Sequence, residues 1–284
     1  MNVYPLKRGR WRLFNFLRRW IQGSVIEMDA TGNRYVLNLD NHIDAHIYLT
    51  NGYESDEIVG FYKRIKSYGC RRFIDVGANI GCYTLFFSSV PEIKKVYAFE
   101  PDRANFAQLE ANLWLNDRLD SVEAFPFALS DTNGKAEFQK IRRQRKLGEL
   151  QYNSGTGSLT YEHPGRADQV EVQVRRFDEL IPIRGERIAI KVDVEGHENC
   201  VLRGMEGCLR ANECVLLIEA TFDPYPLDTW LGKMGYNREP SHVGDNWLYL
   251  KATETRKLFG EFVNSPEQKG QSGGEANEAE ESSG

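Results

Sequence analysis

Residues 73–81, Phe-Ile-Asp-Val-Gly-Ala-Asn-Ile-Gly, constrain the fold of this 284-residue chain more than any other stretch. They begin as a short apolar run, pass through small residues and continue into the apolar stretch 82–87. This order predicts a strand, a tight turn and a helix. The glycines let the backbone approach a ligand closely, and the start of a helix offers N–H groups that have no partner within the helix. The spacing Gly-x-x-x-Gly differs from the dinucleotide fingerprint Gly-x-Gly-x-x-Gly, which argues against a nicotinamide dehydrogenase.

Two acidic residues accompany this turn. Asp75 stands before the first glycine, where it can meet a cationic amine. Glu100 closes the next apolar run, residues 96–99, roughly twenty residues past the turn, and an acid at such a strand tip is placed to accept both hydroxyls of a ribose. A nucleotide-like ligand with an amino-acid end would satisfy both acids. An ordinary strand–helix–strand turn with a surface glutamate is the alternative interpretation.

A second chemical stretch follows at residues 188–198. The apolar run predicts a fourth strand that ends at Asp193, and a helix begins around residue 196. The carboxyl ends of parallel strands face the ligand crevice, so we expect Asp193, Glu195 and His197 to point into it. Residues 215–219 repeat the pattern and place Glu219 at the tip of a fifth strand.

Adjacent strand tips lie roughly 5 Å apart. Asp193 and Glu219 could therefore share a Mg²⁺ ion that also holds an acceptor oxygen. The sequence favours the simpler interpretation without a metal, in which both carboxylates hydrogen-bond the acceptor directly.

Together these stretches resemble the FkbM family of O-methyltransferases, which use S-adenosylmethionine (SAM) and have the class I methyltransferase fold. The resemblance covers roughly residues 50–250 and is carried by these motifs: Gly52-Tyr-Glu54, Asp75-Val-Gly-Ala-Asn-Ile-Gly81, Phe99-Glu-Pro101, Ala128-Leu-Ser-Asp131, Phe177-Asp-Glu-Leu180, Lys191-Val-Asp-Val-Glu-Gly-His-Glu198 and Ile218-Glu219. It implies an α/β protein with a Rossmann-like, doubly wound sheet of seven strands. It also implies a SAM site made by Asp75, Gly77, Ala78, Asn79, Gly81, Glu100, Pro101 and Asp131, with Asp131 accepting from the adenine amine.

The resemblance implies transfer of a methyl group to a hydroxyl of a sugar, a glycan or a hydroxylated natural product. A neutral alcohol is a poor nucleophile, so a base must take its proton as the bond forms. His197 titrates nearest neutral pH, and we expect it to be this base while Asp193 positions the hydroxyl. We expect Glu195, Glu219 and Ser158 to contact the substrate. A capping histidine that only orients Asp193 is the alternative.

A different class of protein stays open, namely a SAM-fold binding or scaffold protein that does not transfer methyl groups. The complete set of acids at the turn and at the strand tips argues against it. Such a scaffold would be docked on a membrane by residues 7–21, in which arginines alternate with aromatic and aliphatic residues before the first acid, Glu27. A basic amphipathic helix can lie on an anionic membrane surface. Packing on the catalytic domain is the other interpretation of this arm.

The chain divides into three predicted parts: a basic amphipathic segment over residues 1–24, a single methyltransferase domain over 25–263, and a disordered tail over 264–284. Within the domain, residues 25–70 begin with two or three short strands up to residue 50, followed by a helix from 57 to 68 that could cover the ligand as a lid. Residues 122–129 are expected to form the third strand, with a hairpin through Asn133 and Gly134 to residues 136–138. The polar, glycine-rich stretch 140–169 suits a loop over the active site.

Composition sets the remaining expectations. A net charge of −5 gives no global attraction for nucleic acid. Five cysteines without a Cys-x-x-Cys pair argue for free thiols in a reducing compartment, and no apolar run approaches the roughly 20 residues that span a bilayer. We therefore expect a cytoplasmic protein, with peripheral contact at the inner face of the membrane as the alternative.

Overall fold

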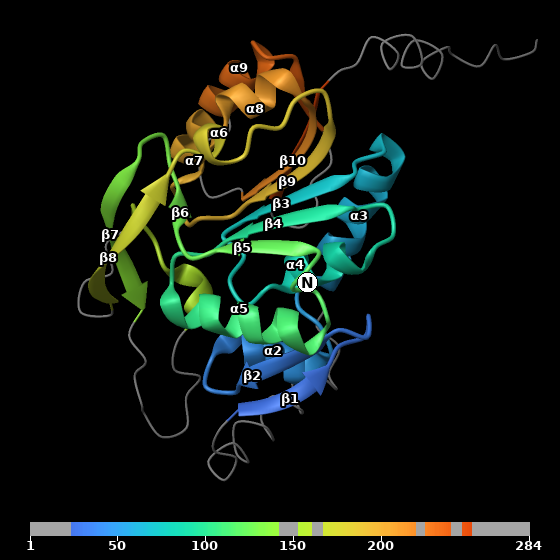
Figure 1. Cartoon of the computed structure of the whole chain (residues 1–284), viewed down its shortest axis with the longest axis vertical. Coiled ribbons are helices and arrows are strands. Elements are labelled where there is room, and N and C mark those ends of the chain that lie inside the picture. The colour runs from blue at the N-terminus through green and yellow to red at the C-terminus, as the bar shows by residue number, and fades with distance from the viewer. Residues whose placement is uncertain (1–23, 142–152, 161–166, 220–224, 240–245, 252–284) are drawn as a thin grey trace, which may run out of the picture. The chain divides into compact units, whose positions relative to one another are not determined.

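The protein is described by a computed structural model, which covers residues 24–141, 153–160, 167–219, 225–239 and 246–251. Its centre is a sheet of seven strands in the order β11-β12-β10-β9-β3-β4-β5 (Figure 1). Neighbours from β10 to β5 are parallel, and β12 runs antiparallel to both β10 and β11. The strands are β3 (Arg72–Val76), β4 (Lys95–Phe99), β5 (Val122–Phe125), β9 (Arg187–Val192), β10 (Glu213–Glu219), β11 (Tyr236–Arg238) and β12 (Asn246–Lys251). The predicted fold class, a Rossmann-like doubly wound sheet of class I methyltransferases, is confirmed.

The strand order reverses between β3 and β9. The chain winds outward through β4 and β5 on one side and through β10 on the other, so the two halves part at the carboxyl ends of the central strands. Ligands of open α/β sheets bind in the crevice at such a switch point. The sequence stretches around residues 77 and 193 therefore meet at this edge because of topology alone.

Helices cover both faces of the sheet, and each face has its own apolar core (Figure 1). The four central strands, β3, β4, β9 and β10, are buried on both faces, which is why they read as largely apolar runs. One face packs against α3 (Ser55–Tyr68), α4 (Cys82–Ser89) and α5 (Arg103–Leu115). The other packs against α6 (Phe177–Leu180), α7 (Glu198–Gly204), α8 (Glu206–Ala211) and α9 (Tyr225–Gly232).

The leading part of the domain differs from the prediction in two ways. The strands β1 (Ser24–Met28) and β2 (Arg34–Asn38) pair as expected, but residues 42–50 form a helix, α2 (His42–Thr50). Apolar residues at every second position suggest a strand, yet buried Asp44 holds the helix by accepting from Asn38 N and Gln108 Nε2. The helix expected over residues 57–68 is present as α3, but it does not lie over the cavity: it buries its apolar stripe against the sheet, and the two residues before it, Tyr53 and Glu54, border the cavity instead.

A second sheet has the order β6-β8-β7, made of β6 (Ala128–Leu129), β7 (Gly134–Ile141) and β8 (Ala167–Arg175). The single strand predicted over 122–129 is therefore wrong: β5 ends at Phe125, and after Pro126, which has no N–H to donate, the chain joins the other sheet. The predicted hairpin is wrong as well, because β7 pairs with β8 rather than with β6.

The described residues belong to one compact unit that ends at Lys251. The predicted amphipathic arm, residues 7–21, and the predicted tail, residues 264–284, lie outside the described residues. The domain boundaries at 25 and 263 stay predictions. Among the described helices, none combines the length and the apolar character needed to cross a bilayer.

Candidate active site

A cavity of about 150 Å³, partly open to solvent, lies at the carboxyl ends of the central strands. Both halves of the sheet contribute to it, together with residues before α3 and a short segment after β7. Of the residues predicted from the sequence, ten line it: Asp75, Gly77, Ala78, Asn79, Glu100, Pro101, Asp193, Glu195, His197 and Glu219. Three do not line it: Gly81, Asp131 and Ser158.

The two glycines of the turn serve close packing of the protein itself. Gly77 has a φ of +83°, and a Cβ atom there would lie 1.8 Å from the carbonyl oxygen of Asp193. Gly81 has a φ of +95°, and its Cβ would lie 2.6 Å from Leu109 Cδ1 on α5. Only glycine fits such positions. The turn after β3 is thereby pressed against the end of β9, which brings the two predicted chemical stretches into contact.

Glu100 holds the turn from the side of β4. Its Oε2 atom accepts from Asn79 N and its Oε1 atom from Asp102 N, both at 2.8 Å. Burial raises the pKa of Glu100 to about 7, although these N–H groups act in the opposite direction. A carboxylate can accept more hydrogen bonds than these two, and a ribose hydroxyl could supply one.

Asp75 lies in the floor of the cavity and is 1% exposed. Its Oδ2 atom accepts from Thr84 Oγ1 at 2.6 Å, whereas its buried Oδ1 atom has no hydrogen-bond partner among the described residues. Burial raises the pKa of Asp75, and the charge of Lys191 opposes the rise. A buried carboxylate oxygen without a partner is costly, so it indicates a donor that a ligand would supply.

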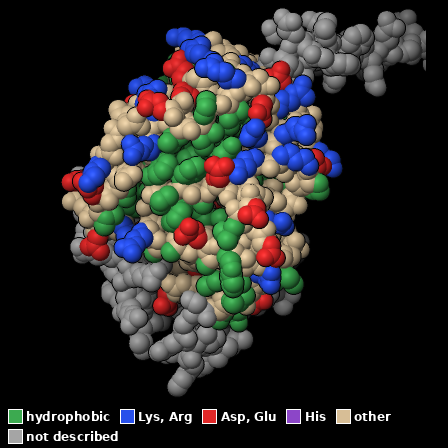
Figure 2. Space-filling model, in the orientation of Figure 1, with side chains coloured by type: hydrophobic (Ala, Val, Ile, Leu, Met, Phe, Trp, Pro, Cys, Tyr) green, Lys and Arg blue, Asp and Glu red, His purple; other side chains and the backbone are tan. Residues whose placement is uncertain are grey.

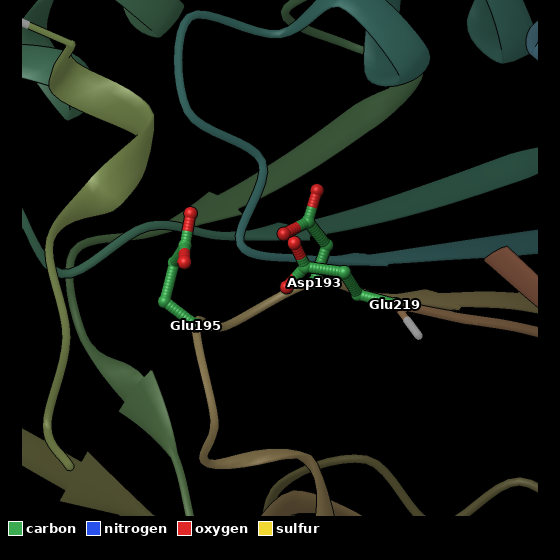
Figure 3. Close-up of side chains that lie close together, drawn as sticks. All are labelled: Asp193, Glu195 and Glu219. Atoms are coloured by element: carbon green, nitrogen blue, oxygen red, sulfur yellow. The ribbon is translucent and has the colours of Figure 1, made fainter. Parts of the chain in front are cut away.

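Three carboxylates meet on the other side of the cavity. Oxygen atoms of Asp193, Glu195 and Glu219 lie within 4.8 Å of one another, and Figure 3 shows Asp193 and Glu219 facing each other with Glu195 beside them. Burial, helped by the neighbouring carboxylates, raises the pKa of Glu195 to about 7 and that of Glu219 to about 9. The tips of β9 and β10 therefore meet as the sequence predicts.

Lys191 also lines the cavity, although it is not among the site residues predicted from the sequence. Its side chain is 4% exposed, and its Nζ atom lies 2.7 Å from Asp193 Oδ2 and 4.7 Å from the centre of the Tyr83 ring. The available signal was a lysine inside an otherwise apolar run, residues 188–192. Such a residue must find a partner when its strand is buried on both faces.

His197 lies apart from this group. One ring nitrogen, Nε2, is 3.0 Å from Ser130 Oγ, and the other, Nδ1, is 3.4 Å from Thr160 Oγ1. Ser130 Oγ in turn donates to Asp131 Oδ1 at 3.2 Å. Burial lowers the pKa of His197, and the charge of Asp131 opposes this change. The ring is thus held toward the end of β6, and no hydrogen bond joins it to Asp193 among the described residues.

Residues 153–160 border the cavity, in line with the expected loop over the active site. Ser154 Oγ donates to Asn79 Oδ1 at 3.3 Å, and Asn105 Nδ2 donates to the Ser154 carbonyl at 3.2 Å. Ser158 is fully buried, and its Oγ atom donates to the carbonyl oxygen of Glu195 at 2.7 Å. Ser158 therefore holds the turn after β9 from behind the cavity wall.

Comparison with known proteins bears on the family of this chain. The model of the methyltransferase FkbM domain matches residues 75–239, more than half of the chain. Methyltransferase sdnD of Sordaria araneosa is 31% identical over 154 residues, which are 47% of this chain and 60% of that protein. Hexuronic acid methyltransferase AglP of Haloferax volcanii is 32% identical over 155 residues, 53% of this chain and 56% of that protein.

The match thus spans less than two thirds of the length of these two relatives. A solved methyltransferase from Geobacter sulfurreducens aligns with 73% of this chain and 85% of its own, at 14% identity and a TM-score of 0.43. The extent of the family match decides the assignment: this chain belongs to the FkbM family of methyltransferases.

Proposed function

We propose that this methyltransferase uses SAM and transfers its methyl group to a hydroxyl of a sugar, a glycan or a hydroxylated natural product. The observation that carries the proposal is the charge of the cavity. Its described lining holds one lysine, Lys191, one histidine, His197, and six carboxylate side chains: Glu54, Asp75, Glu100, Asp193, Glu195 and Glu219. SAM has a sulfonium and an ammonium against a single carboxylate, so this lining attracts it. The pyrophosphate of a dinucleotide would be repelled.

The donor side offers a partner for each polar part of SAM. The Asp75 Oδ1 atom, buried and without a partner among the described residues, suits the methionine ammonium. The Glu100 carboxylate, which lines the cavity, suits the ribose hydroxyls. His197, which lines the cavity and whose ring contacts Ser130, is proposed to border the adenine. When bound, SAM would supply a methyl group that is already activated by its sulfonium, so the protein needs to orient the acceptor and take its proton.

We propose Asp193 as the group that takes this proton. It stands at the switch point, and its main chain is held by a hydrogen bond from Asp193 N to the Val76 carbonyl at 3.1 Å. Glu195 and Glu219 would orient the acceptor around it. The prediction that His197 is the base stays open to test, but the contacts of its ring with Ser130 and Thr160 favour a role on the donor side.

The carboxyl groups of Asp193, Glu195 and Glu219 also affect which chemical class of methyl acceptor can bind. The name of the relative AglP supports a sugar as the acceptor class. A carboxylate acceptor would meet Asp193 at close range, and like charges at such distances repel, whereas Glu195 and Glu219 hold their protons to higher pH than an ordinary glutamate. A neutral hydroxyl avoids this cost, which supports O-methylation at an alcohol.

We propose that transfer needs no metal ion. Three carboxylates within 4.8 Å are the type of ligand that Mg²⁺ prefers, but Lys191 already gives Asp193 a cation at 2.7 Å. Activity should therefore survive thorough treatment with EDTA. Loss of activity that Mg²⁺ restores would contradict this part of the proposal.

Calorimetry with SAM, with its demethylated product and with NAD tests the donor. We expect SAM and its product to bind and NAD not to bind. Binding of NAD alone would contradict the proposal. Binding of SAM without transfer to any acceptor would favour the alternative, a SAM-binding scaffold protein.

A further inference from the structure

Lys191 occupies a position where a lysine is unfavourable unless the protein uses its charge. It lies in β9 between β3 and β10, with Asp75 and Leu217 as its register partners. Its side chain points to the face of the sheet that α4 covers, where the Tyr83 ring lies 4.7 Å from its ammonium. Transferring an ammonium group from water to such a place is costly unless carboxylates compensate it.

The compensation comes from three acids on three separate elements. Asp193 follows β9, Asp75 belongs to β3, and Glu54 precedes α3. Burial by itself would lower the pKa of Lys191, but the charges of Asp193, Asp75 and Glu54 outweigh it and raise the pKa. Lys191 is therefore a permanent cation.

All three acids line the cavity, so the charge of Lys191 acts on the site as well as on the fold. Replacing a buried ion pair by apolar residues is often neutral or stabilising, which makes stability alone a weak reason for this arrangement. The ion pair of Lys191 with Asp193 differs from an ordinary ion pair of a protein core, because Asp193 lines the cavity. The main chain of Asp193 is fixed by Val76 and by the close approach of Gly77, and its side chain is fixed by Lys191. One oxygen of Asp193, Oδ2, accepts from the lysine.

We propose that Lys191 is a positioning residue that holds the Asp193 carboxylate aimed at the acceptor hydroxyl. This inference rests on the proposed function, in which Asp193 takes the proton. It predicts that loss of the lysine impairs proton removal more than donor binding, since Asp75 and Glu100 remain to hold SAM.

The test is Lys191→Met, assayed for methyl transfer as a function of pH. Turnover should fall about 10²-fold, as expected for a misplaced catalytic group, while SAM affinity by calorimetry changes little. The acid limb of the kcat profile should move to higher pH, because the variant lacks the cation adjacent to the proposed base. The other titratable groups that face Asp193 are the same in both proteins: Tyr53, Asp75, Tyr83, Glu195, Glu198 and Glu219.

Lys95→Met is the matched control. Lys95 on β4 makes the same two kinds of contact, with Glu123 Oε1 at 2.8 Å and with the Tyr97 ring at 5.9 Å, but it is not part of the cavity lining. Its replacement should leave the kcat profile where it is. A profile of Lys191→Met that coincides with that of the wild type, with SAM still bound, would overturn the inference and leave the proposed function intact. Failure of the wild type to bind SAM would instead contradict the proposed function.

A double-mutant cycle keeps the test decisive even if Lys191→Met alone does not fold. Removing both partners of a buried pair is tolerated better than removing one, so Lys191→Met combined with Asp193→Asn is the second variant. If Lys191 acts through Asp193, the double variant should turn over no more slowly than Asp193→Asn alone. A further loss of about 10²-fold would show an independent role and would overturn the inference.

Discussion

Glu100 shows how a single side chain can serve both the fold and the ligand. Its two oxygens hold the Asn79 and Asp102 N–H groups and so fix the turn after β3 relative to β4. The same oxygens face the cavity, and burial keeps the pKa of this carboxyl near 7. A ribose that donates two hydroxyls would complete the hydrogen bonds of the ionised form.

Glu100→Ala should weaken SAM binding by about 1–3 kcal/mol, the range for loss of a buried, charged hydrogen-bond partner. Calorimetry measures this directly. Glu123→Ala is the control, because Glu123 lies on the next strand, β5, and pairs with Lys95 away from the cavity. Equal SAM affinity of wild type and Glu100→Ala would count strongly against the ribose assignment.

At the scale of elements, the tips of β9 and β10 concentrate acids that titrate above the usual range. The pKa of Glu195 is raised to about 7 and that of Glu219 to about 9, with burial as the main cause. The folded protein therefore holds protons here that the unfolded chain releases from about pH 4.5 upward. The stabilising contribution is complete below that pH and is lost as the pH rises through 7 and 9.

Glu219→Gln should remove most of this dependence. Between pH 5 and pH 9 the Tm of the wild type should fall relative to that of Glu219→Gln by about 2–4 °C, equivalent to roughly 1 kcal/mol for a chain of this size. Differential scanning calorimetry without ligand gives both curves. The exposed Glu110 on α5 provides the control, since Glu110→Gln should leave the pH dependence of Tm unchanged. If the Tm of wild type and that of Glu219→Gln depend on pH in the same way, Glu219 does not hold its proton in the folded protein as described.

Some of the helices and strands could be predicted from the sequence, and others could not. The parallel strands and the acids at their tips were predictable, because an apolar run that ends in a carboxylate is a local pattern. The helix over residues 42–50 was not, since its buried positions alternate as in a strand and its stabilising contact to Gln108 is distant in the chain. The pairing of β7 with β8 was not predictable either, because residues 142–166 separate the two strands in the sequence.

Within the site, the carboxylates were predicted but their partners were not. The sequence could not show that Lys191 lies opposite Asp75, because that depends on the register between β3 and β9. It also could not show that His197 turns toward Ser130, which follows β6, an element assigned to the wrong sheet from the sequence. Long-range strand pairing decides both contacts, and a local pattern does not encode it.

For the whole molecule, the basic amphipathic arm over residues 7–21 remains a prediction of the sequence. If it binds membrane, the full-length protein should co-sediment with anionic vesicles and should do so less as salt rises, because the Debye length shortens. A variant with Arg18→Glu and Arg19→Glu should co-sediment with anionic vesicles less than the wild type does at the same salt concentration. Equal sedimentation with neutral vesicles, or no sedimentation at all, would indicate that the arm packs on the domain instead.

The central claim is methyl transfer from SAM to a hydroxyl with Asp193 as the proton acceptor. The most direct measurement is the rate at which methyl-labelled SAM labels the glycan, lipid and small-molecule fractions of a host extract, compared among wild type, Asp193→Asn and His197→Ala. We predict labelling of a glycan or hydroxylated small molecule by the wild type, loss of about 10²–10⁴ in rate for Asp193→Asn, and most of the rate retained by His197→Ala, with SAM bound in all three. Retained transfer by Asp193→Asn together with loss in His197→Ala would contradict the account and make His197 the base.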